Sequence, residues 1–333
     1  MNVLITGGSG FIGTNLVDSY VQTGDHVVNV DIAAPRNHDH IKYWTRLDIR
    51  DAVSLRKIVK DFSPHILFHM AARTDLDGTS LEDYSANTDG VRTIIEAVRG
   101  VSELRHAIFA SSMLVCALGH SPKSEEDYCP TTRYGESKVI GERLVRESVC
   151  GSFPWTIVRP TSLWGPWFGV PYKNFFDAVG KGVYMHPKGR NICRSYGFVL
   201  NTIQQLRRIA SYGARGPVEG RTLYLADYEP IELLRWARTI SAKFGVPPPR
   251  EVPLMLLKCM ASVGDVLKRT GVSNNPPLTS FRLNNLLTDA IFDLQELERV
   301  AGATPYNMEQ GVAITVEWMR ADARKPSPIC SAA

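Results

Sequence analysis

A glycine-rich segment directly after the first apolar run constrains the fold of this chain more than any other feature. The apolar run Asn2–Thr6 has the length and composition of a buried β-strand. A helical pattern over Phe11–Thr23 follows and ends at Gly24. Between the two, the sequence is TGGSGFIG over positions 6–13, with glycines at 7, 10 and 13. The segment therefore predicts a tight strand–turn–helix unit, the building block of parallel α/β sheets.

The first half of the chain repeats this alternation of short apolar runs and helical patterns. Further strands are predicted at Val27–Val30, His65–His69, Ala107–Ser111 and Trp155–Val158. In a predicted helix around Leu81–Val98, positions 84, 87, 91, 94, 95 and 98 share one face, which is the spacing of a stripe that packs on a core. We therefore predict an α/β fold with a Rossmann-type doubly wound parallel sheet.

The glycine-rich turn also predicts a ligand. Glycines between a strand and a helix let the backbone approach a pyrophosphate, which then lies at the positive N-terminus of the helix. Asp31 ends the second predicted strand, where a carboxylate can accept hydrogen bonds from the two adenosine ribose hydroxyls. A negative charge there would repel a 2′-phosphate, so the pattern favours NAD over NADP. Arg36 could argue for NADP, but it follows too late in the sequence to outweigh Asp31.

Beyond Pro160 the regular alternation is lost. Gly197–Ala210 is predicted as a strand edge that runs into a helix, and Pro253–Val266 as a core helix within a mainly helical region. We expect residues 1–161 and about 195–225 to form the NAD-binding Rossmann domain. Residues of about 162–194 and 226–325 are expected to form a smaller, mainly helical substrate-binding lobe, and 326–333 a flexible tail.

Composition excludes several classes of protein. Hydrophobic residues make up 44% and charged residues 22% of the chain, and the net charge is only +4, with no basic patch that would bind nucleic acid. No apolar run approaches the roughly 18–20 residues that cross a bilayer. The six cysteines lack metal-ligand spacing and are expected to be reduced thiols. With no charged leader before the first strand, we expect a cytoplasmic protein without a metal, a membrane partner or a nucleic-acid partner.

Tyr134 and Lys138 are the candidate catalytic pair. They lie four positions apart at the start of a predicted helix and so share one face. A free tyrosine titrates at about 10, and a nearby ammonium would stabilise its phenolate, as general acid–base chemistry on a hydroxyl group requires. Ser111 and Ser112 end the strand that precedes this helix, where a hydroxyl can hold the substrate oxygen beside the tyrosine.

Together with the glycine turn, this set resembles the short-chain dehydrogenase/reductase superfamily. The resemblance is closest to its extended branch, the NAD-dependent nucleotide-sugar epimerase/dehydratase family, and covers nearly the whole chain. The motifs that carry it are TGGSGFIG at 6–13, LDIRD at 47–51, HMAA at 69–72, NTDG at 87–90, FASS at 109–112, YGESK at 134–138, RP at 159–160, RSYGFV at 194–199 and FDLQELERVAGATPYNMEQGV at 292–312.

The resemblance implies a role for each matching residue. Tyr134 would be the base, Ser112 would hold the substrate, and Lys138 would also bind the nicotinamide ribose. The cofactor-binding residues would be Gly7, Gly10, Phe11, Ile12, Gly13, Asp31, Asp48, Ile49, Ala71, Ala72, Asn87, Tyr134 and Lys138. The substrate-binding residues would be Ser111, Ser162, Arg194 and Arg282, with the two arginines on a diphosphate. A homodimer built through the helix that bears Tyr134 is also implied.

The sequence departs from the family pattern on the substrate side. Several reactions of the family need an acid or base just after the catalytic serine, but Met113 and Leu114 occupy these positions and cannot move a proton. Elimination, decarboxylation and epimerisation next to a ketone are therefore not expected. Cys116 follows too late to serve and is expected to be a buried structural thiol. Ser162 and Asn201 stand where relatives commonly have Asn and Asp, which leaves the substrate open.

Two reactions need only hydride transfer and one proton. The first is 4-epimerisation of a nucleotide-linked sugar through a transient 4-ketone, which we favour. The second is reduction by an NAD(P)H-dependent 4-ketoreductase. The run at 160–166 also occurs in hydroxysteroid-type reductases, so a bulky alcohol substrate stays an alternative. An NAD-holding redox sensor without catalysis is disfavoured, because such proteins usually lose the tyrosine or the lysine.

Overall fold

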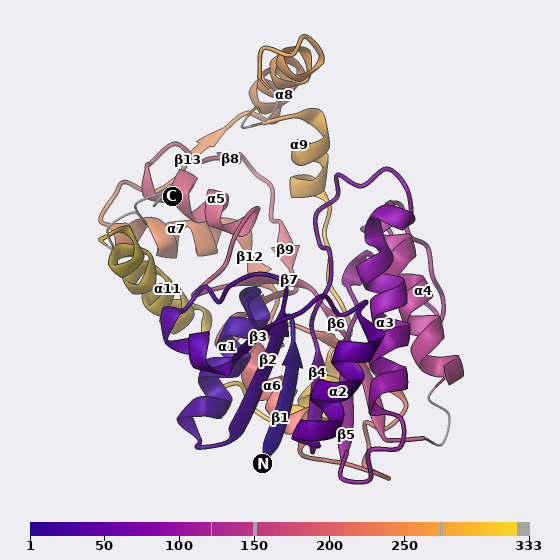
Figure 1. The fold of residues 1–333 in the computed structure, drawn as a ribbon. Coiled ribbons are helices and arrows are strands. Elements are labelled where there is room, and N and C mark those ends of the chain that lie inside the picture. The colour runs from indigo at the N-terminus through magenta and orange to yellow at the C-terminus, as the bar shows by residue number, and fades with distance from the viewer. Residues whose placement is uncertain (121, 149–151, 274–275, 277, 325–333) are drawn as a thin grey trace, which may run out of the picture. The chain divides into compact units, whose positions relative to one another are not determined.

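A seven-stranded parallel sheet forms the centre of the first part of the structure, which is a computed structural model (Figure 1). The structure describes residues 1–120, 122–148, 152–273, 276 and 278–324. The strands are β1 (Asn2–Thr6), β2 (His26–Asp31), β3 (Trp44–Arg46), β4 (Ile66–His69), β5 (His106–Ala110), β6 (Trp155–Pro160) and β11 (Arg221–Leu225). Their spatial order is β11-β6-β5-β4-β1-β2-β3, and every neighbouring pair is parallel.

The strand order reverses between β1 and β4. Leu4 pairs with Val28 of β2 on one side and with Leu67 of β4 on the other. In open parallel sheets, ligands bind beyond the carboxyl ends of the two strands at such a reversal. Because β1 leads directly into the glycine turn, this topology confirms the predicted doubly wound Rossmann-type sheet.

Alternating side chains divide this part of the chain into two cores, one on each face of the sheet. Val3 and Ile5 point to a core shared with α1 (Phe11–Gln22), α6 (Val199–Ala210) and α10 (Gln295–Ala301). Leu4 points to the opposite core, shared with α2 (Ala52–Phe62), α3 (Ser85–Val98) and α4 (Arg133–Ser148). The predicted stripe on α3 is confirmed, because the side chains at 84, 87, 91, 94, 95 and 98 are all buried.

The chain divides into two compact units. The first comprises Met1–Leu163, Gly197–Tyr228 and Phe292–Pro305, and the second comprises Trp164–Tyr196, Glu229–Ile291 and the chain from Tyr306 onward. Residues 292–305 correct the predicted boundary: they lie in the first unit because the apolar side of α10 joins its core. The predicted tail 326–333 lies outside the described residues.

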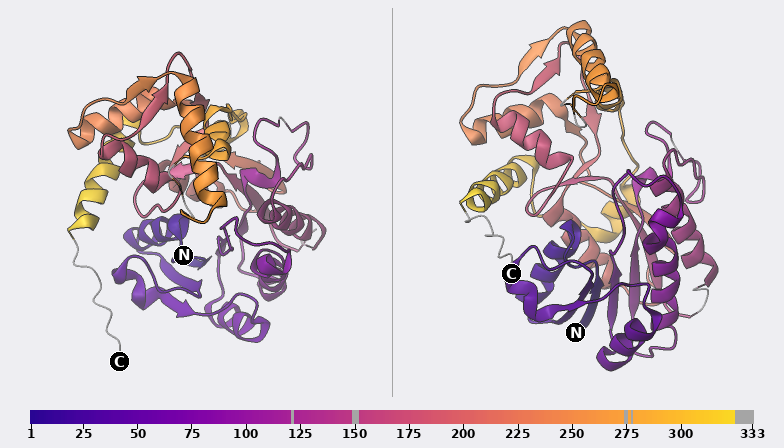
Figure 2. Two further views of the ribbon diagram at one scale, coloured as in Figure 1. Left: turned by 90° about the horizontal axis from the view of Figure 1, so that it is seen from above. Right: turned by 45° about the horizontal axis from the view of Figure 1, so that its top comes forward.

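The second unit is mainly helical, as Figure 2 shows. Its helices are α5 (Tyr172–Gly180), α7 (Leu233–Phe244), α8 (Leu254–Arg269), α9 (Ser280–Leu287) and α11 (Met308–Ala323). The short strands β8 (Met185–Pro187) and β13 (Arg250–Val252) pair in parallel, and β9 (Cys193–Arg194) pairs antiparallel with β12 (Ile231–Glu232). Trp236 of α7 anchors an aromatic core by stacking on Phe175, with ring centroids 4.8 Å apart. The strands β7 (Ser162–Trp164) and β10 (Tyr196–Phe198) lie where the chain leaves and re-enters the first unit.

One predicted element differs in its environment. The predicted core helix 253–266 is present as α8, but only Leu257, Ala261 and Gly264 are buried along it. The prediction of a core position was wrong because α9 covers just one side of this helix. Within the part of the chain that the structure describes, no helix has both the length and the apolar character that a membrane span requires.

Phe68 offers a test of the core. It is fully buried in β4, and its ring lies 5.6 Å from that of Tyr20. We expect Phe68→Ala to lower the free energy of unfolding by about 3–5 kcal/mol, because it removes a large ring and leaves a cavity. The matched change Val53→Ala, at an 82% exposed position on α2, should shift it by less than about 0.5 kcal/mol. Urea unfolding followed by circular dichroism measures both values, and equal losses would place Phe68 outside the core.

Candidate active site

The turn between β1 and α1 can be built only with glycine at two positions. Gly7 has a φ of +75°, and a Cβ there would lie 2.5 Å from the backbone nitrogen of Ala71. A Cβ on Gly13 would collide with the carbonyl oxygen of Gly7. The close approach holds the start of α1 against the turn, and no side chain caps this helix at Gly10. The N-terminus of α1 thus suits an anionic group such as a pyrophosphate.

Asp31 stands at the carboxyl end of β2, as predicted. Its carboxylate accepts hydrogen bonds from the backbone nitrogens of Ser9, at 3.0 Å, and Ala33, at 2.9 Å. A carboxylate has further acceptor sites, which are available to ribose hydroxyls. The structure also places Arg36 close enough to interact with the Asp31 charge, which opposes the lowering of the Arg36 pKa by burial. Sequence distance alone underestimated how near this arginine lies to the predicted ribose site.

The predicted adenine-side residues follow the carboxyl ends of β3 and β4. Asp48 lies on the surface in a paired contact with Arg50, in which Nε lies 3.0 Å from one carboxylate oxygen. Ile49 is buried, and its side chain fills the space beside Gly90 of α3. The Ala71 amide, directly beyond Met70, donates to Thr6 Oγ1 at 3.4 Å, so the predicted dinucleotide-lining pair 71–72 borders the glycine turn.

Asn87 uses its amide to join two segments. Its Oδ1 accepts from the Arg73 backbone nitrogen, while its Nδ2 donates to the Arg73 carbonyl and to Ser137 Oγ, all at 2.9 Å. The side chain is 1% exposed. Asn87 therefore ties the loop after β4 to α4.

The candidate catalytic residues converge at the end of β5. Tyr134 and Lys138 lie one turn apart in α4 and are both buried. Lys138 Nζ donates to the carbonyl oxygen of Ala110, the last residue of β5, at 2.9 Å. Ser112 follows this strand, accepts from the Leu114 nitrogen at 3.1 Å, and exchanges a hydrogen bond with the Tyr134 phenol. The structure thus brings the three predicted side chains together.

Burial controls the protonation of this group. It raises the pKa of Tyr134, although the hydrogen bond with Ser112 partly opposes the shift. Burial also lowers the pKa of Lys138 to about 8, against the opposing charge of Glu142. The predicted acidification of the phenol by Lys138 is not found in this structure, because the amine is held by Ala110 instead. Burial and the Lys138 charge together lower the pKa of His69 to about 3, so His69 is neutral at physiological pH.

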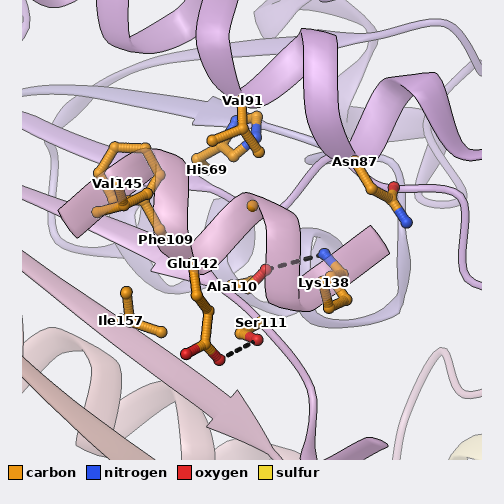
Figure 3. Close-up of a pocket in the computed structure, with 11 residues that line it drawn as sticks. His69, Asn87, Val91, Phe109, Ala110, Ser111, Lys138, Glu142, Val145 and Ile157 are labelled. Carbon is orange, nitrogen blue, oxygen red and sulfur yellow. Dashed lines mark hydrogen bonds between the residues drawn. The ribbon is translucent and has the colours of Figure 1, made fainter. Parts of the chain in front are cut away.

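A small pocket beneath these residues contains groups that the sequence analysis did not single out (Figure 3). It is lined from α3, α4, β4, β5 and β6, and Glu142 projects into it from α4. Arg159 binds Glu142 through two nitrogens, each at 2.8 Å, with both side chains 1% exposed. Glu142 lies four positions after Lys138, so the spacing that linked Tyr134 to Lys138 could have revealed it.

The hydroxyl of Ser111 is already hydrogen-bonded within the protein. Its hydroxyl donates to Glu142 Oε1 at 2.5 Å, and the residue is buried. The predicted substrate contact of this side chain is therefore replaced by a bond that fixes the end of β5 to α4. Tyr128 adds a second hydroxyl on the other Glu142 oxygen, at 2.9 Å.

The remaining predicted substrate residues belong to different units. Ser162 is buried in β7 of the first unit. Arg194 and Arg282 belong to the second unit, where Arg194 donates to the Asn285 carbonyl and Arg282 to the Pro276 carbonyl at 2.5 Å. Arg194 is buried, and its Nε has no hydrogen-bond partner among the described residues. A bound anion could therefore accept a hydrogen bond from that nitrogen.

Asn201 has a neighbour that explains its departure from the family pattern. Its Nδ2 donates to Asp227 at 2.8 Å, and the Phe198 nitrogen donates to the other carboxylate oxygen at 3.0 Å. Burial raises the pKa of Asp227 to about 7. A carboxylate therefore lies beside this position in space, although it comes from the segment after β11.

The described cysteines are free thiols. Cys116 is buried, and its Sγ donates to the Asp127 carbonyl at 3.2 Å, which confirms the predicted structural thiol. Cys129, Cys193 and Cys259 are also free. No group of three or more His, Cys, Asp or Glu side chains in the described ranges is arranged to hold a metal ion.

Comparison with known families assigns the chain to a family. The sequence profile described as the NAD dependent epimerase/dehydratase family matches residues 3–179, from β1 through most of α5. The chain belongs to this family. It is an NAD-dependent enzyme of the extended short-chain dehydrogenase/reductase type, as predicted, and the turn, the uncapped helix and Asp31 fit that cofactor.

Individual relatives are distant and varied. The chain is 23% identical over 330 residues to an N-acetyl-alpha-D-glucosaminyl-diphospho-ditrans,octacis-undecaprenol 4-epimerase from Escherichia coli O157:H7, with 97% of each chain covered. It is 26% identical to a 3-beta-hydroxysteroid dehydrogenase from Mycolicibacterium neoaurum, over 93% of this chain and 89% of the other. The UDP-glucose 4-epimerase of Thermotoga maritima, solved with UDP-glucose, shares the fold at a TM-score of 0.74 and 18% identity, covering 97% and 100% of the two chains.

Lys138 provides a test of the electrostatics of the site. Below its folded pKa of about 8 the amine is charged in both folded and unfolded chains, so the cost of burying the charge is fully present. That cost falls as the pH rises, and it vanishes above pH 10.5, where the amine is neutral in both the folded and the unfolded chain. We therefore expect Lys138→Met to raise the free energy of unfolding at pH 7 by about 2 kcal/mol, after allowance for the lost bond to Ala110.

Urea unfolding at pH 7 and pH 10 measures this effect, and the advantage of the variant should shrink at the higher pH. Lys60→Met on α2 is the matched control. Because Lys60 is exposed, this change should alter the free energy of unfolding by the same small amount at pH 7 and at pH 10. A Lys138→Met protein less stable than the unaltered chain at pH 7 would contradict the burial cost.

Proposed function

We propose that this enzyme is an NAD-dependent 4-epimerase of a sugar carried on a diphosphate, working through a transient 4-ketone. The observation that carries the proposal is the intact group Ser112, Tyr134 and Lys138. The two residues directly after Ser112 carry no acid or base. Met113 and Leu114 form a short 3₁₀ turn at that point and can neither donate nor accept a side-chain proton. The site therefore supports hydride transfer with one proton and no further step.

Each residue has a distinct role in this proposal. Tyr134 would remove the proton from the 4-hydroxyl and return it after the ketone has turned over. Ser112 would hold the reacting oxygen, since its hydroxyl already shares a hydrogen bond with the phenol. Lys138 would supply the positive charge that lowers the pKa of the phenol, after its amine leaves the Ala110 carbonyl for the reaction centre. NAD, when bound, would supply the hydride acceptor and donor for the carbon that carries the 4-hydroxyl.

The proposed cofactor contacts follow the predicted assignment. Gly7, Gly10, Phe11, Ile12 and Gly13 would hold the pyrophosphate, and Asp31 the adenosine ribose, because the turn and the carboxylate end adjacent strands. The adenine and nicotinamide sides would be lined by Asp48, Ile49, Ala71, Ala72, Asn87, Tyr134 and Lys138.

The substrate class rests on relatives and on two arginines. The Thermotoga maritima enzyme is solved with UDP-glucose, and the Escherichia coli relative is named for a sugar joined through a diphosphate to undecaprenol. Arg194 and Arg282 would bind the diphosphate, to which a guanidinium offers parallel donors. The free Nε of buried Arg194 supports this role. We also propose a cytoplasmic homodimer built through α4, and light scattering after gel filtration tests its size.

A hydroxysteroid-type alcohol dehydrogenase is the second candidate. The specific observation in its favour is the match to the Mycolicibacterium neoaurum 3-beta-hydroxysteroid dehydrogenase across 93% of this chain. The chemistry assigned to Ser112, Tyr134 and Lys138 would be the same, since only one alcohol carbon reacts. A diphosphate would then be absent from the substrate, and the two arginines would have no substrate phosphate to bind.

Tyr134→Phe tests the catalytic assignment. Removal of the phenol oxygen should lower kcat by about 100- to 10,000-fold, the usual contribution of a general acid–base group. NAD binding, measured by calorimetry, should change less than about threefold, because most predicted cofactor contacts come from other residues. Tyr43→Phe, at a tyrosine in the short turn His38–Tyr43, is the control and should leave both values unchanged. A Tyr134→Phe enzyme with most of its rate would refute the assigned base.

The substrate class is tested with ligands. We expect UDP, GDP or CDP to raise the melting temperature of the NAD-bound enzyme, since a ligand that binds the native state stabilises it. UDP-hexoses or their lipid-linked counterparts should be epimerised at C4 without added NADH. Stabilisation by a 3β-hydroxysteroid, and by none of the nucleotides, would establish the second candidate instead. Net consumption of NADH with a 4-keto sugar would identify a ketoreductase.

A further inference from the structure

The helix α8 exposes an apolar face that its unit leaves uncovered. Met255 is 68% exposed, Val263 59% and Val266 58%, and Leu256 and Met260 are also classed among the exposed large hydrophobic side chains. Large apolar side chains are normally covered in proteins that remain monomeric in water, and a contiguous group of them indicates an interaction surface. We refer to these five residues as the α8 face.

The periodicity of the helix confirms that these side chains form one surface. At about 100° per residue, Leu256, Met260 and Val263 form one row, and Met255 and Val266 lie along its edge. The opposite side, through Leu257, Ala261 and Gly264, packs against Leu283 of α9 and its neighbours.

The orientation of α8 is fixed by close packing. A Cβ on Gly264 would collide with the carbonyl oxygen of Leu278, so this side of the helix lies directly against the segment before α9. Asp265 strengthens the contact, since its carboxylate accepts from the Ser280 nitrogen at 3.1 Å, at the start of α9. In Figures 1 and 2, α8 lies beside α9 and away from α5, α7 and α11 of the same unit. The α8 face is therefore held outward rather than free to fold back.

Two exposed cations lie along one edge of this face. At about 100° per residue, Lys258 and Arg269 lie beside Met255, whereas Lys268 lies on the packed side of the helix. The pKa of Asp265 is lowered by its hydrogen bonds with Ser280 at the start of α9 and, to a smaller extent, by the charges of Arg269 and Lys268. An apolar face with lysine and arginine beside it matches the composition of helices that lie in the plane of a membrane surface.

We propose that the α8 face docks on a lipid bilayer that carries anionic headgroups. The apolar side chains would enter the boundary between headgroups and acyl chains, while Lys258 and Arg269 at the edge of the face contact the phosphates. The expectation of no membrane partner rested on the lack of a spanning segment, and a helix that lies in the interface needs none. A contact between two copies of the chain through this face is the competing occupant, and the oligomeric state of the α8 variants distinguishes it.

The test uses the whole chain and vesicles of defined composition. We expect the unaltered protein to float with vesicles of equal parts phosphatidylglycerol and phosphatidylcholine, and to bind pure phosphatidylcholine at least tenfold more weakly. The triple variant Met255→Asp, Val263→Asp and Val266→Asp should lose at least tenfold of the binding to anionic vesicles. Lys258→Gln and Arg269→Gln together should also weaken it, and should flatten its dependence on salt.

Helix α2 of the first unit supplies matched controls. Val53→Asp changes a similarly exposed valine, and the combined change Arg56→Gln and Lys60→Gln removes two exposed cations from one helix. Neither control should alter vesicle binding. Circular dichroism and the affinity for NAD establish that all variants are folded, and neither depends on the substrate class proposed above.

Three results would overturn the proposal. The unaltered protein could fail to bind anionic vesicles at low salt, or the α8 variants could bind as well as the α2 controls. The third result concerns a protein partner: if light scattering shows that the α8 variants dissociate an oligomer of the unaltered chain, the face is an interface between copies.

Discussion

The buried carboxylate of Glu142 is the group on which the geometry of the active site depends. It accepts two bonds from Arg159 of β6 and one from Ser111 at the end of β5, while α4 carries it one turn beyond Lys138. A helix on a sheet could slide or rotate against apolar side chains alone. Directional bonds to two neighbouring strands prevent this, and so they fix where Tyr134 and Lys138 meet the strand ends.

The same carboxylate neutralises only one of the two cations buried at the site. Two cations, Lys138 and Arg159, are buried beside one anion, and Arg159 takes both oxygens of Glu142. Lys138 is left with a single carbonyl partner and a pKa of about 8. A buried ion pair contributes little net stability, because desolvation offsets the attraction. In the proposed mechanism, this poorly stabilised amine would gain by moving toward a developing phenolate.

Local features of the sequence were sufficient for much of this fold. The glycine turn, the alternating runs and the stripe on α3 each depend on neighbours within one or two turns of chain, and each was confirmed. The strand β3 was not predicted because its three residues are too few for a detectable periodicity, and β11 was not predicted because it lies beyond Pro160, where the regular alternation of the sequence is lost. The partner of Ser111 is 31 positions away, and no local pattern could reveal that its hydroxyl was already engaged.

The helix α8 shows a different limit. Its apolar pattern correctly predicted a helix. Hydrophobicity alone, however, does not show which of its apolar side chains pack against the rest of the protein. Leu257 and Met255 are equally apolar in the sequence, yet one packs on α9 and the other faces water. Arg36 is the polar counterpart: it follows Asp31 by five positions, and its interaction with the Asp31 charge could not be read from the sequence pattern.

The two units of the chain carry different parts of the proposed site. The proposed proton-transfer group belongs entirely to the first unit, where a parallel sheet and the Glu142 bonds leave few positions for it. Arg194 and Arg282 belong to the second unit, and there each holds a backbone carbonyl of a nearby segment. Replacing one such arginine alters a local tether and leaves the sheet intact. Under the proposed assignment, substrate preference can change through Arg194 and Arg282 while the residues proposed for proton and hydride transfer keep their positions in the first unit.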